Sequence, residues 1–345
     1  MKTESVAFQA LLAYSYVVLW VTLSGAVILY NKWLLAYGGF PFPISLTMFH
    51  MAFCSVLAFL LVQFGAVTPL DSMTWDLYAR TILPIGSLYA LVLWTGNSAY
   101  LYISVSFIQM LKALAPVSVF AVSCLFGVDN FTLPKLANMF FVGLGVVIAS
   151  AGEIEFVAVG VVFQLCSMVM ESCRLTLVQI LLQRRGLKLN PVTTLYYVAP
   201  CCCFFLVPLF LFLELPVMRS GEVEWQFDWF YMITNAFVAF ALNIAIFLLI
   251  GKTSALTMNV AGVLKDWGLI LLSVALYGSP VMPSQYFGYS IAFLAVAYYN
   301  YSKYQAAMAD KAGPTPSKIP ETERLITPSR SSPRRVAEQS KDESV

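Results

Sequence analysis

The stretch SFIQMLKALAPVSVFAVSCLFG (residues 106–127) carries one charged side chain, Lys112, in an otherwise apolar and weakly polar segment. About 20 mainly apolar residues suffice for a helix to cross the hydrocarbon core of a bilayer. The expected span begins near Ser104, so at about 1.5 Å per residue Lys112 lies roughly 12 Å into it. A lysine at the centre of a membrane helix costs about 2.5–3.5 kcal/mol on insertion scales. The segment therefore predicts a membrane helix whose lysine has a function.

The composition of the whole chain indicates the same class of protein. Of its 345 residues, 60% are hydrophobic and 11% are charged, whereas soluble domains carry about 25% charged residues. The first apolar segment has no charge from Ser5 to Asn31, which is too long for a signal-peptide core, so we expect it to be retained. His50 is the only histidine. A zinc site is therefore not expected, and neither is any other cofactor.

Apolar intervals with no charge or only one or two charged residues divide the chain into ten expected spans. These are 5–31, one within 33–70, 81–101, 104–127, 136–152, 156–183, 189–213, 229–251, 254–278 and 283–301. We therefore predict an all-α membrane protein with ten transmembrane helices. Lys and Arg are concentrated in the loops after even-numbered spans, which predicts that both termini face the cytosol. Residues 309–345 are rich in Pro, Ser, Thr and charge, so we expect a disordered cytosolic tail.

Two pairs of segments indicate an internal duplication. FPISLTMFH (42–50) and NPVTTLYYV (190–198) share a proline, a β-branched residue, a hydroxyl residue and aromatic residues. IQMLKAL (108–114) and VAGVLKDW (260–267) each place Leu-Lys inside the fourth span of a half. Because five spans is an odd number, the halves 1–152 and 153–308 would form a 5+5 inverted repeat. Such repeats place substrate sites near the bilayer midplane.

The lysines of the two matched spans are candidate ligands for an anion. The repeat predicts that Lys112 and Lys265 approach one cavity from opposite halves. Pro116 lacks an N–H and should break the helix beside Lys112. A structural pair between Lys112 and a buried carboxylate such as Glu171 is the alternative interpretation.

The neighbouring residue Asp266 extends this candidate site. Lys265 and Asp266 point about 100° apart around a helix, which argues against a direct pair between them. Asp266 would either bind a sugar hydroxyl or neutralise a lysine. Glu171 and Arg174 share a helix face at a spacing of i, i+3, so we expect either a structural ion pair or a gate that re-forms during transport.

Other polar and aromatic side chains in the spans have two interpretations each. An amide in a membrane helix bonds neighbouring helices or contacts a ligand, and a tyrosine packs in the core or stacks on a nucleobase. Lys32, at the edge of the first span, is expected at the membrane interface, and Gly262 would permit a helix break before Lys265. The further candidates for substrate binding are Asn97, Gln109, Asn259, Tyr196 and Tyr197.

Several motifs together resemble those of a known family. They are YNKW (30–33), LTMFHM (46–51), SFIQMLKALAPV (106–117), LNPVTTLYYVAPC (189–201) and ALTMNVAGVLKDW (255–267). They resemble the plant-type nucleotide-sugar and triose-phosphate translocators of the drug/metabolite transporter superfamily. The resemblance implies ten helices in a 5+5 inverted repeat, exchange by alternating access, and residence in the Golgi or a related endomembrane.

The same resemblance implies roles for the charged residues. In the phosphate translocators, a span-4 lysine and a span-9 Lys-Arg pair bind the phosphate of the substrate. Lys112 and Lys265 occupy the lysine positions, whereas Asp266 replaces the arginine. This chain is thus similar to the Lys-Asp subgroup, whose members resemble nucleotide-sugar carriers.

We therefore predict a Golgi antiporter, with other endomembranes as alternative locations. It would exchange a cytosolic nucleotide sugar for a luminal nucleoside monophosphate; exchange of sugar phosphate for phosphate is the alternative. The absence of a histidine cluster speaks against an enzyme, and the short luminal loops speak against a receptor. The bilayer is the expected environment, no nucleic-acid partner is expected, and the sequence is compatible with a homodimer.

Overall fold

The computed structural model of the protein describes residues 6–69, 73–154, 156–185, 191–249 and 255–312. The helices are α1 (Val6–Ala36), α2 (Pro43–Gln63), α3 (Trp75–Tyr102), α4 (Val105–Lys112), α5 (Ala115–Leu125), α6 (Leu133–Ala151), α7 (Ala158–Arg185), α8 (Pro191–Leu209), α9 (Leu215–Ser220), α10 (Trp229–Leu249), α11 (Ala255–Tyr277) and α12 (Pro283–Ala312), with a π-helical segment at Phe210–Glu214. Over these residues the predicted all-α class is confirmed. The chain divides into a compact unit, Met1–Ser302, which is described below, and a second unit, Lys303–Val345.

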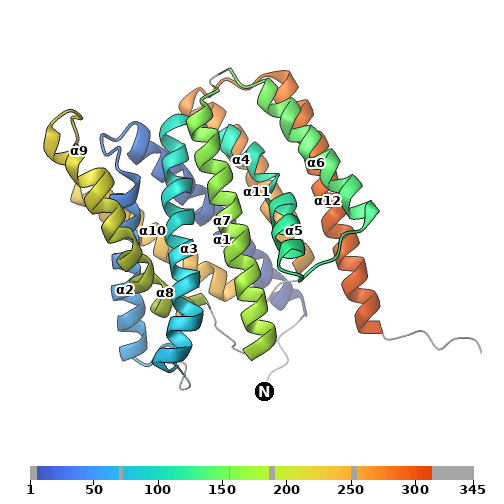
Figure 1. Ribbon diagram of the computed structural model, residues 1–345, viewed down its shortest axis with the longest axis horizontal. Coiled ribbons are helices and arrows are strands. Elements are labelled where there is room, and N and C mark those ends of the chain that lie inside the picture. The colour runs from blue at the N-terminus through green and yellow to red at the C-terminus, as the bar shows by residue number, and fades with distance from the viewer. Residues whose placement is uncertain (1–5, 70–72, 155, 186–190, 250–254, 313–345) are drawn as a thin grey trace, which may run out of the picture. The chain divides into compact units, whose positions relative to one another are not determined.

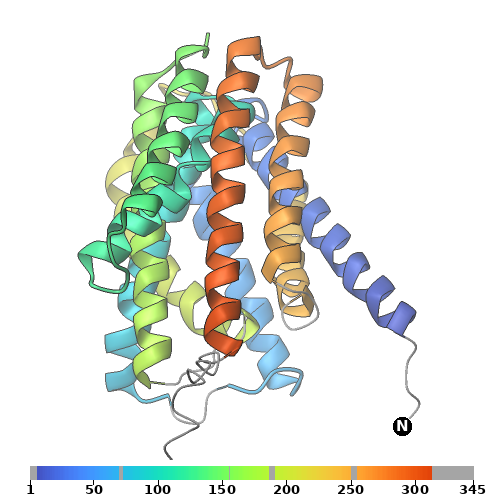
Figure 2. The ribbon, with the colours of Figure 1, turned by 90° about the vertical axis from the view of Figure 1, so that its right-hand side faces the viewer.

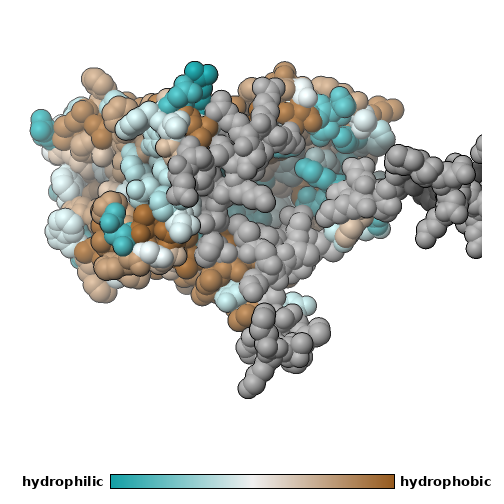
Figure 3. All heavy atoms as spheres, turned by 90° about the horizontal axis from the view of Figure 1, so that it is seen from below, coloured by the Kyte–Doolittle hydropathy of each residue, from teal (hydrophilic) through white to brown (hydrophobic). Residues whose placement is uncertain are grey.

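Seven of the described helices are long and apolar enough to cross a bilayer, or eight if the bent pair α4–α5 is one span. Neither α11 nor α12 is among them, so ten spans stay a prediction. Large apolar side chains point outward: Leu125 is 84% exposed and Phe212 is 79% exposed. Figure 3, a view from below, shows brown apolar groups around the described part of the bundle, with white and teal groups between them. This surface suits hydrocarbon rather than water.

The long helices run alternately up and down the bundle (Figures 1 and 2). α3 packs along α7, α2 along α8, α1 along α10, and α4 against α11. Each of these pairs joins a helix from residues 1–152 to a helix from residues 153–302. The core between the predicted halves is therefore built mainly from contacts between segments that are far apart in the sequence.

The helix break predicted from Pro116 is present. α4 ends at Lys112 and α5 begins at Ala115, with a bend of 40° between them. At the bend, the amides of Ala113 and Leu114 donate to carbonyls three residues earlier, as in a 3₁₀ turn. The proline is the second residue of α5, where the missing N–H costs no helical hydrogen bond.

The seventh expected span extends further than predicted. Instead of ending near residue 213, the chain continues through the π-helical segment and α9 to Ser220. The carboxylate of Glu214 accepts hydrogen bonds from the amides of Ile44 (2.6 Å) and Ser45 (2.7 Å) and from the Ser45 hydroxyl (2.6 Å). These contacts satisfy donors at the first turn of α2 and explain how a carboxylate is buried here.

Glycines bring α6 and α12 into backbone contact. A Cβ on Gly145 would lie 2.6 Å from the carbonyl oxygen of Gly288, and a Cβ on Gly288 would lie 2.5 Å from the nitrogen of Ala149. The sequence GLGVVIAS (143–150) thus supplies a face of small residues for helix packing.

Substitution of Gly145 tests this contact. Gly145→Leu must push α6 away from α12, because the new side chain meets backbone rather than a flexible side chain. Overpacking of this kind costs about 1–3 kcal/mol, so we expect a lower thermal-unfolding midpoint for the purified protein in detergent. Gly143→Leu is the matched control, since a Cβ there has no neighbour within 4 Å. Equal midpoints for the two variants would contradict the contact.

Candidate functional site

A cavity of about 460 Å³ lies inside the bundle between α3, α5, α7 and α11. Its polar and charged lining comes from both predicted halves. These residues are Asn97, Tyr100, Lys112, Gln164, Ser167, Glu171, Ser172, Lys265 and Asp266. The structure thus brings five of the sequence-predicted residues to one cavity: Asn97, Lys112, Glu171, Lys265 and Asp266.

Lys112 enters the cavity from the break between α4 and α5. Its ammonium group makes no hydrogen bond and no ion pair with any residue in the described ranges. Glu171 also lines the cavity but pairs with Arg174 instead of with Lys112. Lys112 therefore brings a positive charge that the described protein does not neutralise by contact.

Lys265 and Asp266 form a direct ion pair, with 3.3 Å between the lysine Nζ and the aspartate Oδ1. The expectation that these neighbours could not pair is wrong, because the flexible four-carbon stem of lysine can turn back toward the next residue. Helix α11 also continues unbroken through Gly262, so the break that this glycine would permit is not formed. The Lys265 ammonium lies 5.8 Å from the centre of the Trp20 ring, which adds a cation–π contact.

Glu171 and Arg174 form a two-pronged pair on α7. The arginine Nε and Nη2 donate to the two carboxylate oxygens over 2.7 Å and 2.6 Å. The guanidinium also lies 5.0 Å from the centre of the Tyr89 ring on α3. Bidentate geometry makes this a strong, oriented pair, and its position at the cavity wall suits either a structural pair or a gate.

Together these contacts set the charge balance of the cavity. Asp266 offsets Lys265 and Arg174 offsets Glu171, so the formal charge of Lys112 is left over. A buried charge without a partner is unfavourable. The cavity is therefore arranged to accept an anionic group beside Lys112.

Asn97 lines the cavity, but its side-chain amide forms hydrogen bonds to α1 and α2. Its Oδ1 accepts from Asn31 (3.2 Å), and its Nδ2 donates to the hydroxyl of Thr47 (3.0 Å). The amide thus bonds helices together in this conformation, and its orientation is fixed by its partners.

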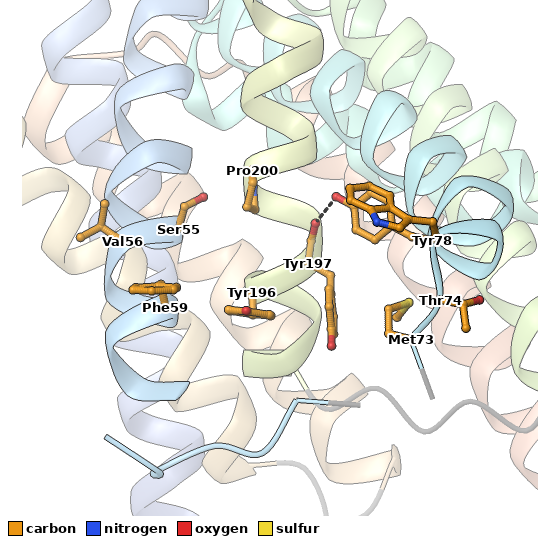
Figure 4. Close-up of a pocket in the computed structure, with 10 residues that line it drawn as sticks. Ser55, Val56, Phe59, Met73, Thr74, Tyr78, Tyr196, Tyr197 and Pro200 are labelled. Atoms are coloured by element: carbon orange, nitrogen blue, oxygen red, sulfur yellow. Dashed lines mark hydrogen bonds between the residues drawn. The ribbon is translucent and has the colours of Figure 1, made fainter. Parts of the chain in front are cut away.

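The other sequence candidates whose side chains are described do not line this cavity. Gln109 is 1% exposed, and its amide nitrogen and oxygen have no hydrogen-bond partner among the described residues; it is not among the residues that line the cavity. The side chain of Asn259 lies outside the described residues. Tyr196 and Tyr197 line a separate pocket of about 640 Å³ between α2, α3 and α8 (Figure 4). There the Tyr78 hydroxyl donates to the backbone carbonyl of Tyr197 (3.0 Å), so the tyrosine pair is not placed to stack on a base in the charged cavity.

Sequence reasoning missed two features of this region. The first is the burial of Lys32 within the protein: it is 7% exposed and donates to the carbonyls of Tyr100 (2.7 Å) and Ile103 (3.2 Å). Its place at the membrane interface stays a prediction. The polar face of α7 was also overlooked, although Gln164, Ser167 and Glu171 follow the helical spacing of i, i+3, i+7. That spacing was a usable signal.

These features define a class of protein: a helical membrane protein with a charged cavity inside its bundle. The model of the Triose-phosphate Transporter family matches residues 11–300. The chain belongs to this family and is a membrane transporter.

Relatives with similar sequences are found in Arabidopsis thaliana. One probable sugar phosphate/phosphate translocator is 52% identical over 310 residues, which is 89% of this chain and 88% of the relative. Another is 50% identical over 328 residues, covering 94% and 93% of the two chains. UDP-uronic acid transporter 1 is 29% identical over 304 residues, covering 87% of this chain and 98% of that one.

The charge balance of the cavity can be tested by Asp266→Asn, which leaves Lys265 without its carboxylate. We expect inorganic phosphate to bind more tightly, by about tenfold, which corresponds to about 1.4 kcal/mol. Thermal-shift titration of the purified protein with phosphate measures this change. Asp129→Asn is the control, because it removes the carboxylate of a pair (Lys135–Asp129, 2.7 Å) that is outside the cavity. Unchanged affinity in Asp266→Asn would show that this pair does not govern anion binding.

Proposed function

We propose that the protein is a nucleotide-sugar antiporter of an endomembrane. It carries a cytosolic nucleotide sugar inward to the lumen and returns a nucleoside monophosphate. The observation that supports this most directly is the unpaired Lys112 ammonium in the same cavity as the Lys265–Asp266 pair.

The charge balance explains why transport would be an exchange. When the empty carrier closes, water leaves the cavity and Lys112 loses its solvation. A phosphate group of a ligand replaces that solvation with charge-assisted hydrogen bonds. Reorientation is then fast only when the cavity is loaded, so each inward step requires an outward anion.

Asp266 and the size of the cavity favour a nucleotide sugar over a triose phosphate. A second free cation would suit a small dianion, but Asp266 pairs with Lys265 instead. When a phosphate draws Lys265 away, the carboxylate of Asp266 becomes an acceptor for a sugar hydroxyl. The volume of about 460 Å³ lies in the range of about 300–1,000 Å³ typical of sites for drug-sized ligands, and a nucleotide sugar is a ligand of that size.

The helix pairs support ten spans in a 5+5 inverted repeat with halves 1–152 and 153–308. If α1, α2, α3, α4–α5 and α6 correspond to α7, α8, α10, α11 and α12, a two-fold axis exchanges the pairs α1–α10 and α3–α7. The same axis maps α2–α8, α4–α11 and α6–α12 onto themselves, and all of these pairs are in contact. Both termini then lie on one side, which we assign to the cytosol of a Golgi membrane from the basic loops.

Exchange of a sugar phosphate for phosphate is the second candidate. The observation in its favour is that relatives at 50% and 52% identity carry the name probable sugar phosphate/phosphate translocator. UDP-uronic acid transporter 1, whose name gives a nucleotide-sugar substrate, is more distant at 29% identity.

Uptake into liposomes separates the two candidates. Liposomes with the purified protein are preloaded with nucleoside monophosphates, with phosphate or with buffer, and are offered labelled nucleotide sugars and sugar phosphates. We expect nucleotide-sugar uptake to be far faster with the monophosphate preload, because the return step requires an anion. Equal uptake by empty and loaded liposomes would refute exchange, and preference for the sugar phosphate–phosphate couple would support the second candidate.

Lys112→Ala and Lys265→Ala test the two ammonium groups. Hydrogen bonds to charged groups are worth about 1.5–3 kcal/mol, so we expect exchange to fall by roughly a hundredfold in each variant while folded yield is kept. Lys135→Ala, at a lysine outside the cavity, should exchange like the wild type. Retained exchange in either cavity variant would remove that lysine from the site.

A further inference from the structure

Two consecutive residues of α1 hold the neighbouring helix α10. The hydroxyl of Tyr30 lies 2.7 Å from the Thr234 hydroxyl, and the Oδ1 of Asn31 accepts a hydrogen bond from the Nδ2 of Asn235 over 2.9 Å. Both bonds join segments 204 residues apart. These residues belong to the last turns of α1 (Val6–Ala36) and the first turns of α10 (Trp229–Leu249), and Figure 1 draws these helix ends toward the top of the bundle.

The second of these bonds starts a relay that reaches the cavity. Asn235 donates to Asn31, Asn31 donates to Asn97 (3.2 Å), and Asn97 donates to Thr47 (3.0 Å). The Thr47 hydroxyl donates in turn to the carbonyl of Pro43 (2.7 Å). Because Asn31 and Asn97 each use the amide oxygen for one neighbour and the nitrogen for the next, the orientation of the Asn97 side chain depends on Asn31 and, through it, on Asn235.

The relay crosses between the predicted halves only once. Asn31, Asn97, Thr47 and Pro43 belong to residues 1–152, whereas Asn235 belongs to residues 153–308. A carrier that alternates its access changes the contacts between its halves. The Asn235–Asn31 bond is thus the member of the relay that such a motion breaks.

Asn235, which donates that bond, is buried with its own amide oxygen unpaired among the described residues. Asn235 is 0% exposed, and its Oδ1 has no hydrogen-bond partner in the described part of the chain. An unpaired buried acceptor is unfavourable, and this cost offsets part of the gain from the bond to Asn31. A contact with a small net gain can break and re-form during transport.

We propose that the Asn31–Asn235 bond is a latch that closes the end of the bundle where α1 ends, and that Asn97 links this latch to the cavity. Asn31 and Asn235 are positioning residues, because they act on the cavity through the side chain of Asn97. The inference rests on the proposed transport cycle but not on the identity of the substrate.

Hydrogen–deuterium exchange of the full-length protein in nanodiscs, without substrate, tests the latch. Asn235→Ala removes the donor, and the loss of one hydrogen bond corresponds to roughly a three- to tenfold change in an opening equilibrium. We expect peptides from the end of α1 and the start of α10 to take up deuterium faster by that factor. Peptides from the end of α2 and the start of α3, at the opposite end of the bundle, should keep the wild-type rate. A general loss of stability would instead accelerate both ends.

Two further variants make the test independent of the folding of Asn235→Ala. Thr234→Val removes the parallel bond to Tyr30 with little change in shape and should accelerate the same peptides. Asn97→Ala does not touch α10, yet the relay requires that it too accelerates the α10 peptide, since coupling between two sites is reciprocal.

Asn243→Ala is the matched control on α10, because the Asn243 amide donates within its own helix to the carbonyl of Ala239 (2.9 Å). Wild-type uptake at the end of α1 in both Asn235→Ala and Thr234→Val would overturn the latch. An effect of those two variants but none of Asn97→Ala would overturn the link to the cavity. Since no substrate is added, these outcomes stay distinct from a failure of the proposed exchange activity.

Discussion

The ammonium group of Lys112 is the feature on which the rest of this structure depends. A lysine inside a membrane helix is unfavourable unless water or a counter-charge stabilises it, and no described residue pairs with it. The break between α4 and α5 places the group beside a cavity instead of in a packed interface. A solvated cavity makes an unpaired lysine tolerable, and the unpaired lysine makes the same cavity selective for anions.

The other charged side chains at the cavity form ion pairs. Lys265 is balanced by Asp266, and Glu171 is balanced by Arg174. These pairs differ in strength, because Glu171 and Arg174 share two short bonds whereas Lys265 and Asp266 are joined by one contact of 3.3 Å. An arriving phosphate can therefore recruit Lys265 more easily than it can open the pair on α7. The first pair suits ligand binding, and the second suits a wall or gate that stays closed until the ligand is in place.

How much the sequence predicted depends on the range of the interactions involved. The helix class follows from hydrophobic length and the break at Pro116 from the proline ring, while the expectation that Lys112 and Lys265 share one cavity came from the proposed internal repeat. The burial of Lys32 and the hydrogen bonds of Asn97 depend on partners about 50 to 70 residues away, and no local pattern reports such a contact. Tyr196 and Tyr197 were assigned to the cavity from residue type alone, yet they lie in another pocket. The direct Lys265–Asp266 pair was missed because helix geometry gives the direction of Cβ and not the reach of a long side chain.

The proposed two-fold scaffold is chemically unequal at its two ends. The shift of 148 residues that aligns Pro43 with Pro191 brings Asn31 to Gln179, which is next to Val178. Whereas Asn31 and Tyr30 bond to α10 through side-chain amides and hydroxyls, Val178 packs against an apolar cluster that includes Ile82 and Ile85. Polar bonds inside a membrane protein are directional and hold one register, but apolar contacts can be exchanged for lipid or other apolar groups at little cost. If the repeat and the proposed latch hold, one end is closed by side-chain amide and hydroxyl bonds that Asn97 links to the cavity, and the other end by an apolar cluster that includes the Tyr78–Tyr197 hydrogen bond. An antiporter that faces two compartments with different solutes has a use for two exits that open under different conditions.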